Sequence, residues 1–144
     1  MTPSWLDRLS EADLEESLPA PVRELLKSHE TCGDTIDDIA AWLASSPKDL
    51  GVGAKTTLPS NLWGRTRQEV YLLICARDAK YKELRRTLLR EARKAKPVIV
   101  GLIAAAVSDC LGLDAGLLTP FVILCLILVV RIGKEAWCQS FADG

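Results

Sequence analysis

The sequence predicts an all-α protein with short acidic N-terminal helices, one long basic amphipathic helix and a C-terminal apolar helical hairpin. Through most of residues 1–96, apolar side chains recur every three or four positions, and Ser, Pro and Gly stand at the expected helix ends. After Pro97 the chain carries two uncharged apolar runs, residues 98–107 and 117–130, with a glycine-containing turn between them. The 144 residues are 49% apolar and 26% charged, which is the composition of a folded globular protein.

Residues 1–46 are expected to form an acidic helical unit. Ser10 stands three positions before Asp13, a weak form of the capping box. Pro21 fits the first turn of a second helix, and Gly33 fits the C-terminal cap of that helix. The apolar positions are Trp5, Leu6, Leu9, Leu14 and Leu18 in the first element, Val22, Leu25 and Leu26 in the second, and Ile36, Ile39, Ala40 and Leu43 in a third.

The next two segments are predicted to be a linker and a long helix. In residues 47–62, Gly, Pro, Ser and Thr dominate and no apolar period survives. Residues 63–96 continue one helical period through Val70, Leu73, Ile74, Tyr81, Leu84, Leu88 and Ala92. A single helix of about 30 residues would be roughly 45 Å long. Because that exceeds a compact domain of this size, the helix is expected to bend, break or project.

Charge is distributed unevenly, although the net charge of the whole chain is only −1. Residues 1–50 carry a net charge of −7, residues 51–96 carry +8 and residues 97–144 carry −2. Either the acidic unit folds back on the basic segment, or the basic segment faces an anionic partner or surface.

Residues 97–141 are predicted to form a helical hairpin that lies either in a membrane or in a protein core. The second helix has no polar face from Phe121 to Val130, and such a helix must be buried on every side. Basic residues flank the hairpin on both sides, which would place both ends in the cytoplasm if it spans a membrane. The first helix would be only about 24 Å long, and Pro120 favours a helix start, so both segments are short for a span.

Two sets of residues are candidates for contact with lipid or protein. The apolar set, expected in a membrane or a core, is Val98, Ile99, Leu102, Ile103, Phe121, Val122, Leu124, Leu126, Ile127 and Val130. The second set, expected to contact headgroups or a protein partner, is Arg85, Arg86, Arg90, Arg93, Lys94, Lys96, Arg131, Lys134 and Trp137.

The residue pattern predicts no catalytic, cofactor or metal site and no small-molecule substrate. His29 is the single histidine, and the five cysteines form no Cys-x-x-Cys pair. Free thiols in a reduced cytoplasmic compartment fit this pattern best. The segment GVGAKTT, which begins at Gly51, lacks the second glycine of a phosphate loop. Tyr81 is the only aromatic residue in the basic run 77–96, so nucleic-acid binding is not favoured.

Two functions of different class remain open. The first is a non-enzymatic accessory or adaptor protein that binds a protein partner through helical surfaces and is anchored to a membrane or assembly by its hairpin. The second is a small membrane-active effector, such as a pore-former, holin-like protein or toxin, whose hairpin inserts and oligomerises. The expected location is the inner (cytoplasmic) membrane with both termini cytoplasmic, or else the soluble cytoplasm.

Overall fold

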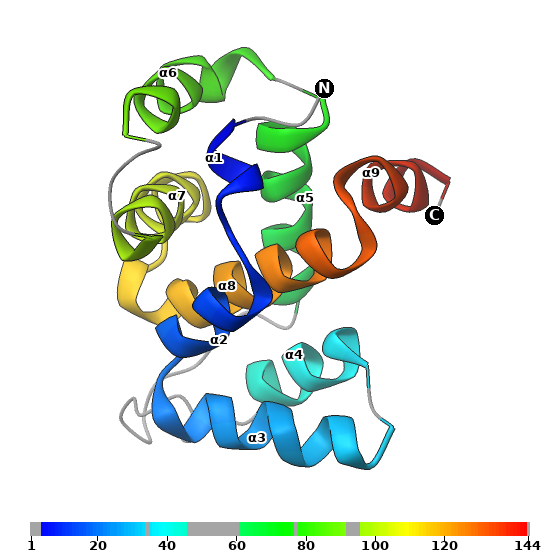
Figure 1. Ribbon diagram of the computed structural model, residues 1–144. Helices are drawn as coiled ribbons and strands as arrows, with labels where there is room; N and C mark the ends of the chain where they lie inside the picture. The colour runs from blue at the N-terminus through cyan, green and yellow to red at the C-terminus, as the bar shows by residue number, and fades with distance from the viewer. Residues whose placement is uncertain (1–3, 34, 46–60, 77, 92–95, 144) are drawn as a thin grey trace.

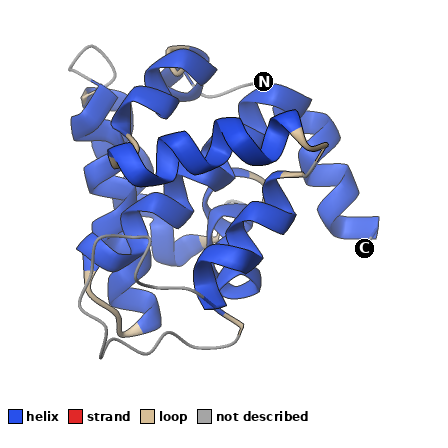
Figure 2. Ribbon diagram, turned by 90° about the horizontal axis from the view of Figure 1, so that it is seen from below, coloured by secondary structure: helices blue, strands red, loops and turns tan. Residues whose placement is uncertain are grey.

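The structure is a computed structural model, and it describes residues 4–33, 35–45, 61–76, 78–91 and 96–143. Within these ranges all regular structure is helical, so the all-α fold class is confirmed (Figure 2). The elements are α1 (Ser4–Asp7), α2 (Glu11–Ser17), α3 (Ala20–Thr31), α4 (Ile36–Ser45), α5 (Leu62–Ile74), the 3₁₀ turn η2 (Ala79–Tyr81), α6 (Lys82–Arg90), α7 (Lys96–Leu111), α8 (Ala115–Ile132) and α9 (Lys134–Asp143).

Helix α8 is the central helix of a bundle. It packs against α2, α4, α5, α7 and α9, and these helices surround it in the ribbon view (Figure 1). Seven consecutive α8 residues, from Phe121 to Ile127, are fully buried. A helix that is apolar on every face needs cover on every face, and here neighbouring protein helices supply that cover.

The N-terminal helices form with the caps that the sequence predicts. Asp13 donates its backbone N–H to Ser10 Oγ at 3.2 Å, so Ser10 caps α2. Gly33 follows α3 with a φ of +86°, a conformation that favours glycine. The first predicted element is divided into α1 and α2, with a turn around Arg8 and Leu9.

The helical segment predicted for residues 63–96, which was expected to bend, break or project, breaks into α5 and α6. Asp78 is the reason for the break. Its side chain accepts the backbone N–H of Lys80 at 2.9 Å and starts η2, an alternative to continued helix that Asp readily offers. Of the predicted linker 47–62, residues 47–60 lie outside the described residues, and Leu62 is already the first residue of α5.

The hairpin turns where the sequence predicts, but its second helix begins earlier. Gly112 has a φ of +69° in the turn between α7 and α8. Asp114 caps α8 by accepting the N–H of Gly116 at 2.7 Å, which places Pro120 inside the helix rather than at its start. The region predicted as the hairpin also contains α9, a separate helix that follows Gly133.

Candidate functional site

Most of the apolar hairpin candidates lie in the protein core. Ile99, Ile103, Phe121, Val122, Leu124, Leu126 and Ile127 are all at most 2% exposed. Leu102 and Val130 are half-buried, whereas Val98 is 42% exposed. Among the described residues, α8 is the one helix long and apolar enough to cross a membrane, with a mean hydropathy of 2.5. A core helix of a folded bundle has the same length and composition, so this property alone does not distinguish lipid from protein.

Arg131 ties the C-terminal end of α8 to the acidic N-terminal unit. Its guanidinium donates to Glu11 of α2 from Nε and to Glu30 of α3 from Nη2, each at 2.7 Å. Arg131 was placed among the partner-contact candidates, but here it bridges two carboxylates within the chain. The acidic unit also meets α5, where Trp63 Nε1 donates to Asp37 at 2.8 Å. The acidic unit therefore contacts the basic segment 51–96 through Asp37 and α5, whereas Glu11 and Glu30 pair with Arg131 of α8, outside that segment.

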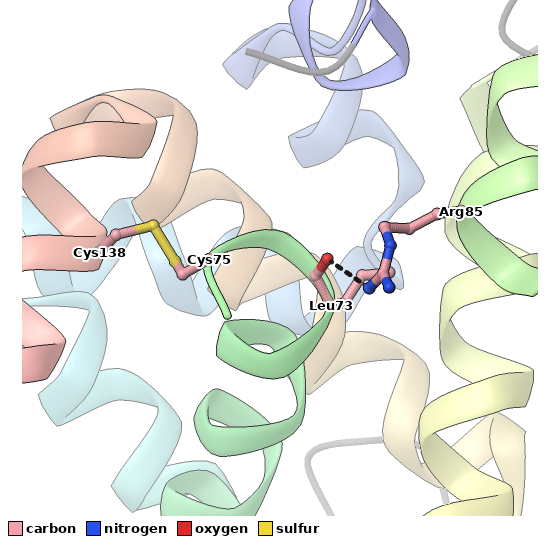
Figure 3. Close-up of a disulfide and its surroundings, with 4 residues drawn as sticks. All are labelled: Leu73, Cys75, Arg85 and Cys138. Carbon is pink, nitrogen blue, oxygen red and sulfur yellow. Dashed lines mark hydrogen bonds between the residues drawn. A yellow bond between two sulfur atoms is a disulfide. The ribbon is translucent and has the colours of Figure 1, made fainter. Parts of the chain in front are cut away.

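A disulfide joins α5 and α9, which corrects the expectation that all five cysteines are free. Cys75 follows the last residue of α5, and Cys138 lies in α9 (Figure 3). Their Cα atoms are 5.7 Å apart, although the residues are separated by 63 positions in sequence. Cys32, Cys110 and Cys125 remain free thiols. Such a bond persists in an oxidising compartment and is transient in a reducing one, so a permanently reduced protein no longer follows from the cysteine pattern.

The basic candidates separate into internal and exposed groups. Arg85 is internal: it donates to the backbone carbonyl of Leu73 at 3.3 Å and to that of Asp78 at 2.7 Å, and so spans the break between α5 and α6 (Figure 3). By contrast, Arg86 and Arg90 are exposed on α6.

Of the remaining basic and aromatic candidates, the structure describes the side chains of Lys134 and Trp137. Arg93 and Lys94 lie outside the described residues, and Lys96 begins α7. Lys134 is half-buried. Trp137 is only 1% exposed, so its expected position at a membrane interface is wrong and its ring packs in the core instead.

The outer face of α6 carries an apolar side chain between cations. Leu89 is 56% exposed, and together with Glu83, Arg86 and Arg90 it lines a hollow of about 440 Å³. The opposite face of the same helix is fixed in the core by Leu88, which is fully buried. We call Arg86, Leu89 and Arg90 the α6 patch.

A polar cluster lies where η2 meets α5 and α7. Glu69 accepts a hydrogen bond from the Tyr81 hydroxyl at 2.7 Å and pairs with Lys80 at 2.7 Å. Burial raises the pKa of Glu69, but the hydrogen bonds from Lys80 and Tyr81 and the charge of Lys80 outweigh burial and hold the pKa below its usual 4.5. The Cys110 sulfur is 3.4 Å from the Tyr81 hydroxyl and borders a cleft of about 290 Å³.

This cluster holds η2 against α5 at the break in the helix. Glu69 of α5 binds Lys80 and Tyr81 of η2, so these contacts join the two sides of the break between α5 and α6. The sequence analysis did not single out Glu69 or Lys80. The one signal available was that Glu69 stands four positions before Leu73 and so shares the apolar face of the helical period. No group of three or more His, Cys, Asp or Glu within the described part of the chain is placed to hold a metal ion.

Comparisons with protein-family models, curated proteins and solved structures give no match to this chain.

Proposed function

We propose that the protein is a non-enzymatic accessory protein that binds an acidic protein partner through the α6 patch. The observation that carries this proposal is the exposure of Leu89 between two arginines. At 56%, it is more exposed than the other exposed large hydrophobic residues of the described chain, Trp42, Val98 and Ile132. Burying a leucine side chain in an interface contributes about 1.5–3 kcal/mol.

Charge complementarity indicates the chemistry of the partner. Arg86 and Arg90 flank Leu89, and Lys82 is exposed at the start of the same helix. Glu83 is the acidic side chain beside the hollow, and it pairs with Arg86 at 3.0 Å on the surface. An acidic helix or loop with one apolar side chain would fill the hollow and pair with the arginines, and such pairing would favour fast and selective association.

The packed hairpin supports this role as a scaffold. Leu88 of α6 is buried, α6 packs on α7, and α7 packs along α8. Arg85 holds the start of α6 against the end of α5. The α6 patch therefore lies on a rigid helix face, and a preorganised surface loses less conformational entropy on binding.

Charge reversal on the patch tests the proposal. The full chain is used to capture partners from its own cells, alongside the Arg86→Glu/Arg90→Glu double variant and a control, Arg8→Glu/Lys27→Glu. The control makes the same change in net charge at exposed positions on other elements. We expect an acidic protein to be captured by wild type and control but lost from the patch variant, and its purified complex to weaken with added salt.

Two results would contradict the proposal. One is the capture of the same proteins by the patch variant and the control. The other is a stable monomer that captures no partner. A sizing column could also show that wild type and control are dimers and that the patch variant is a monomer. In that case the occupant of the patch is a second copy of the chain, and the accessory role is replaced by self-association.

The alternative is a membrane-active effector whose hairpin leaves the bundle and inserts in lipid. The observation that favours it is the length of α8, 18 residues with a mean hydropathy of 2.5. The shorter apolar segment Val98–Leu111 packs beside it and would complete a hairpin. Release of an entrapped dye from vesicles that contain anionic lipid would support this function. Full dye retention at high protein load would exclude it.

A further inference from the structure

We infer that the Cys75–Cys138 disulfide is a thiol-controlled clasp that keeps α9 and the C-terminal end of α8 docked in the bundle. The clasp goes beyond the accessory role, and it holds whether or not the α6 patch binds a partner. Three observations carry it: the part of the chain that the bond encloses, the few other attachments of α9, and the accessibility of the two cysteines.

The bond encloses the whole apolar hairpin in one covalent loop. The residues between Cys75 and Cys138 include α6, α7 and α8 (Figure 1). The N-terminal end of the loop is fixed, because Arg85 binds the carbonyl of Leu73, one residue before the end of α5 (Figure 3). With the bond closed, α9 stays tethered to the end of α5, which limits how far the C-terminal end of α8 can move. With the bond open, that end is restrained by noncovalent contacts alone.

For α9 itself, the noncovalent packing is limited to few neighbouring helices. Among the described helices, α9 packs substantially against only α5 and α8. Its main buried side chain is Trp137, next to the cysteine that forms the bond. The turn before α9 is Gly133, at a φ of +103°, so the direction of α9 depends on a single residue. At the end of α8, the side chain of Arg131 is 38% exposed, and its ion pairs with Glu11 and Glu30 are correspondingly weak.

The two cysteines lie at the edge of the core and not inside it. Both are half-buried rather than enclosed. Attack by a dithiol reductant breaks the S–S bond, and two electrons and two protons convert Cys75 and Cys138 to thiols while the reductant becomes a disulfide. The redox state of the surrounding thiol pool then sets whether α9 is held. Disulfides at partly exposed positions are the ones that serve in regulation.

The alkylation rate of Cys125 can report whether the C-terminal half of α8 is released from the bundle. It lies in the middle of α8 with 0% exposure, and burial raises the pKa of its thiol well above the usual value. A thiol that is both covered and protonated reacts slowly with alkylating reagents. In a Cys32→Ser/Cys110→Ser background with the disulfide closed, Cys125 is the one thiol left to label.

The experiment compares that background with the same protein carrying Cys75→Ser and Cys138→Ser in addition. We expect alkylation of Cys125 to be faster by about ten-fold or more in the open variant, because local opening exposes the C-terminal half of α8. Amide hydrogen exchange is followed in parallel. It should accelerate in α8 and α9 but not in α6, which packs against α1, η2 and α7 and lies away from α9 (Figure 1). Wild type treated with dithiothreitol should show the same pattern, and reoxidation should reverse it.

Two results would overturn the clasp. Equal alkylation rates with the bond open and closed would mean that α9 remains docked without it. Acceleration of α6 exchange in step with α8 would mean that the bond stabilises the whole fold and does not control one end of it.

Discussion

Replacing Leu126 by Ala removes a side chain that is 0% exposed in the centre of α8, whereas Leu89→Ala removes one that is 56% exposed on α6. A fully buried Leu→Ala change costs about 2–5 kcal/mol, because the lost transfer free energy is joined by the free energy of the cavity left behind. Surface substitutions usually stay within about 0.5 kcal/mol. We therefore expect Leu126→Ala to reduce the free energy of unfolding by about 3 kcal/mol and Leu89→Ala to leave it nearly unchanged.

Urea unfolding of both variants, followed by far-ultraviolet circular dichroism in detergent-free buffer, measures this difference. With a denaturant slope of about 2 kcal/mol/M, a loss of about 3 kcal/mol lowers the midpoint by about 1.5 M. The slope itself should not change. Equal midpoints for the two variants would refute the packing of α8 as a protein core, because lipid or a loose assembly around Leu126 adapts to a smaller side chain.

Three further predictions test the contacts around α8. Because the pKa of Glu69 is held below its usual 4.5, its contribution to stability is present above that pH and is lost as the pH falls through the folded-state pKa. The stability gap between wild type and Glu69→Gln should therefore narrow on acidification below about pH 4.5, as measured by thermal melts. Arg131→Met should lower the free energy of unfolding by about 1 kcal/mol at low salt and by less at high salt, since partly exposed ion pairs are weak and screened; a salt-independent loss would contradict the ion-pair explanation. The Cys75→Ser/Cys138→Ser variant should show no further acceleration of amide exchange in α8 and α9 on addition of reductant, because the bond that reductant opens is already absent; wild-type exchange that ignores reductant would show that the bond is not formed.

Local chemistry made most of the helix ends predictable from the sequence. Ser10 caps α2 and Gly33 ends α3 because side-chain acceptors and left-handed glycines act within a few residues of a terminus. The hairpin turn at Gly112 follows from the same rule. The apolar period also identified the buried positions of α8, since a helix without a polar face has to be enclosed.

Three features were not predicted. A bend or break was expected in the long helix, but its position after Cys75 was hidden because Ile74 and Tyr81 stand seven positions apart and keep the helical period across it. The start of α8 at Ala115 depends on Asp114 as a cap, whereas Pro120 alone pointed to a later start. The disulfide could not be predicted, because pairing between two of five cysteines is decided by the fold and not by their spacing.

The α6 patch was predicted only in part. Arg86 and Arg90 were named from the basic run, but Leu89, the apolar centre of the patch, was not. The same run includes Arg85, which the fold uses internally to hold the end of α5. From the sequence alone, basic residues that face solvent cannot be told from those that bind inside the protein. The difference depends on which face of the helix meets the neighbouring helices.

The most direct test of the packed hairpin is fractionation of the expressed full chain without detergent, with amide hydrogen exchange on the fraction that contains it. If α8 is the core of a bundle folded in water, the chain runs at a defined size on a sizing column and the amides of Phe121–Ile127 are among the slowest to exchange. Retention in an alkaline-washed membrane pellet, with release only by detergent, would contradict that account and place the hairpin in lipid.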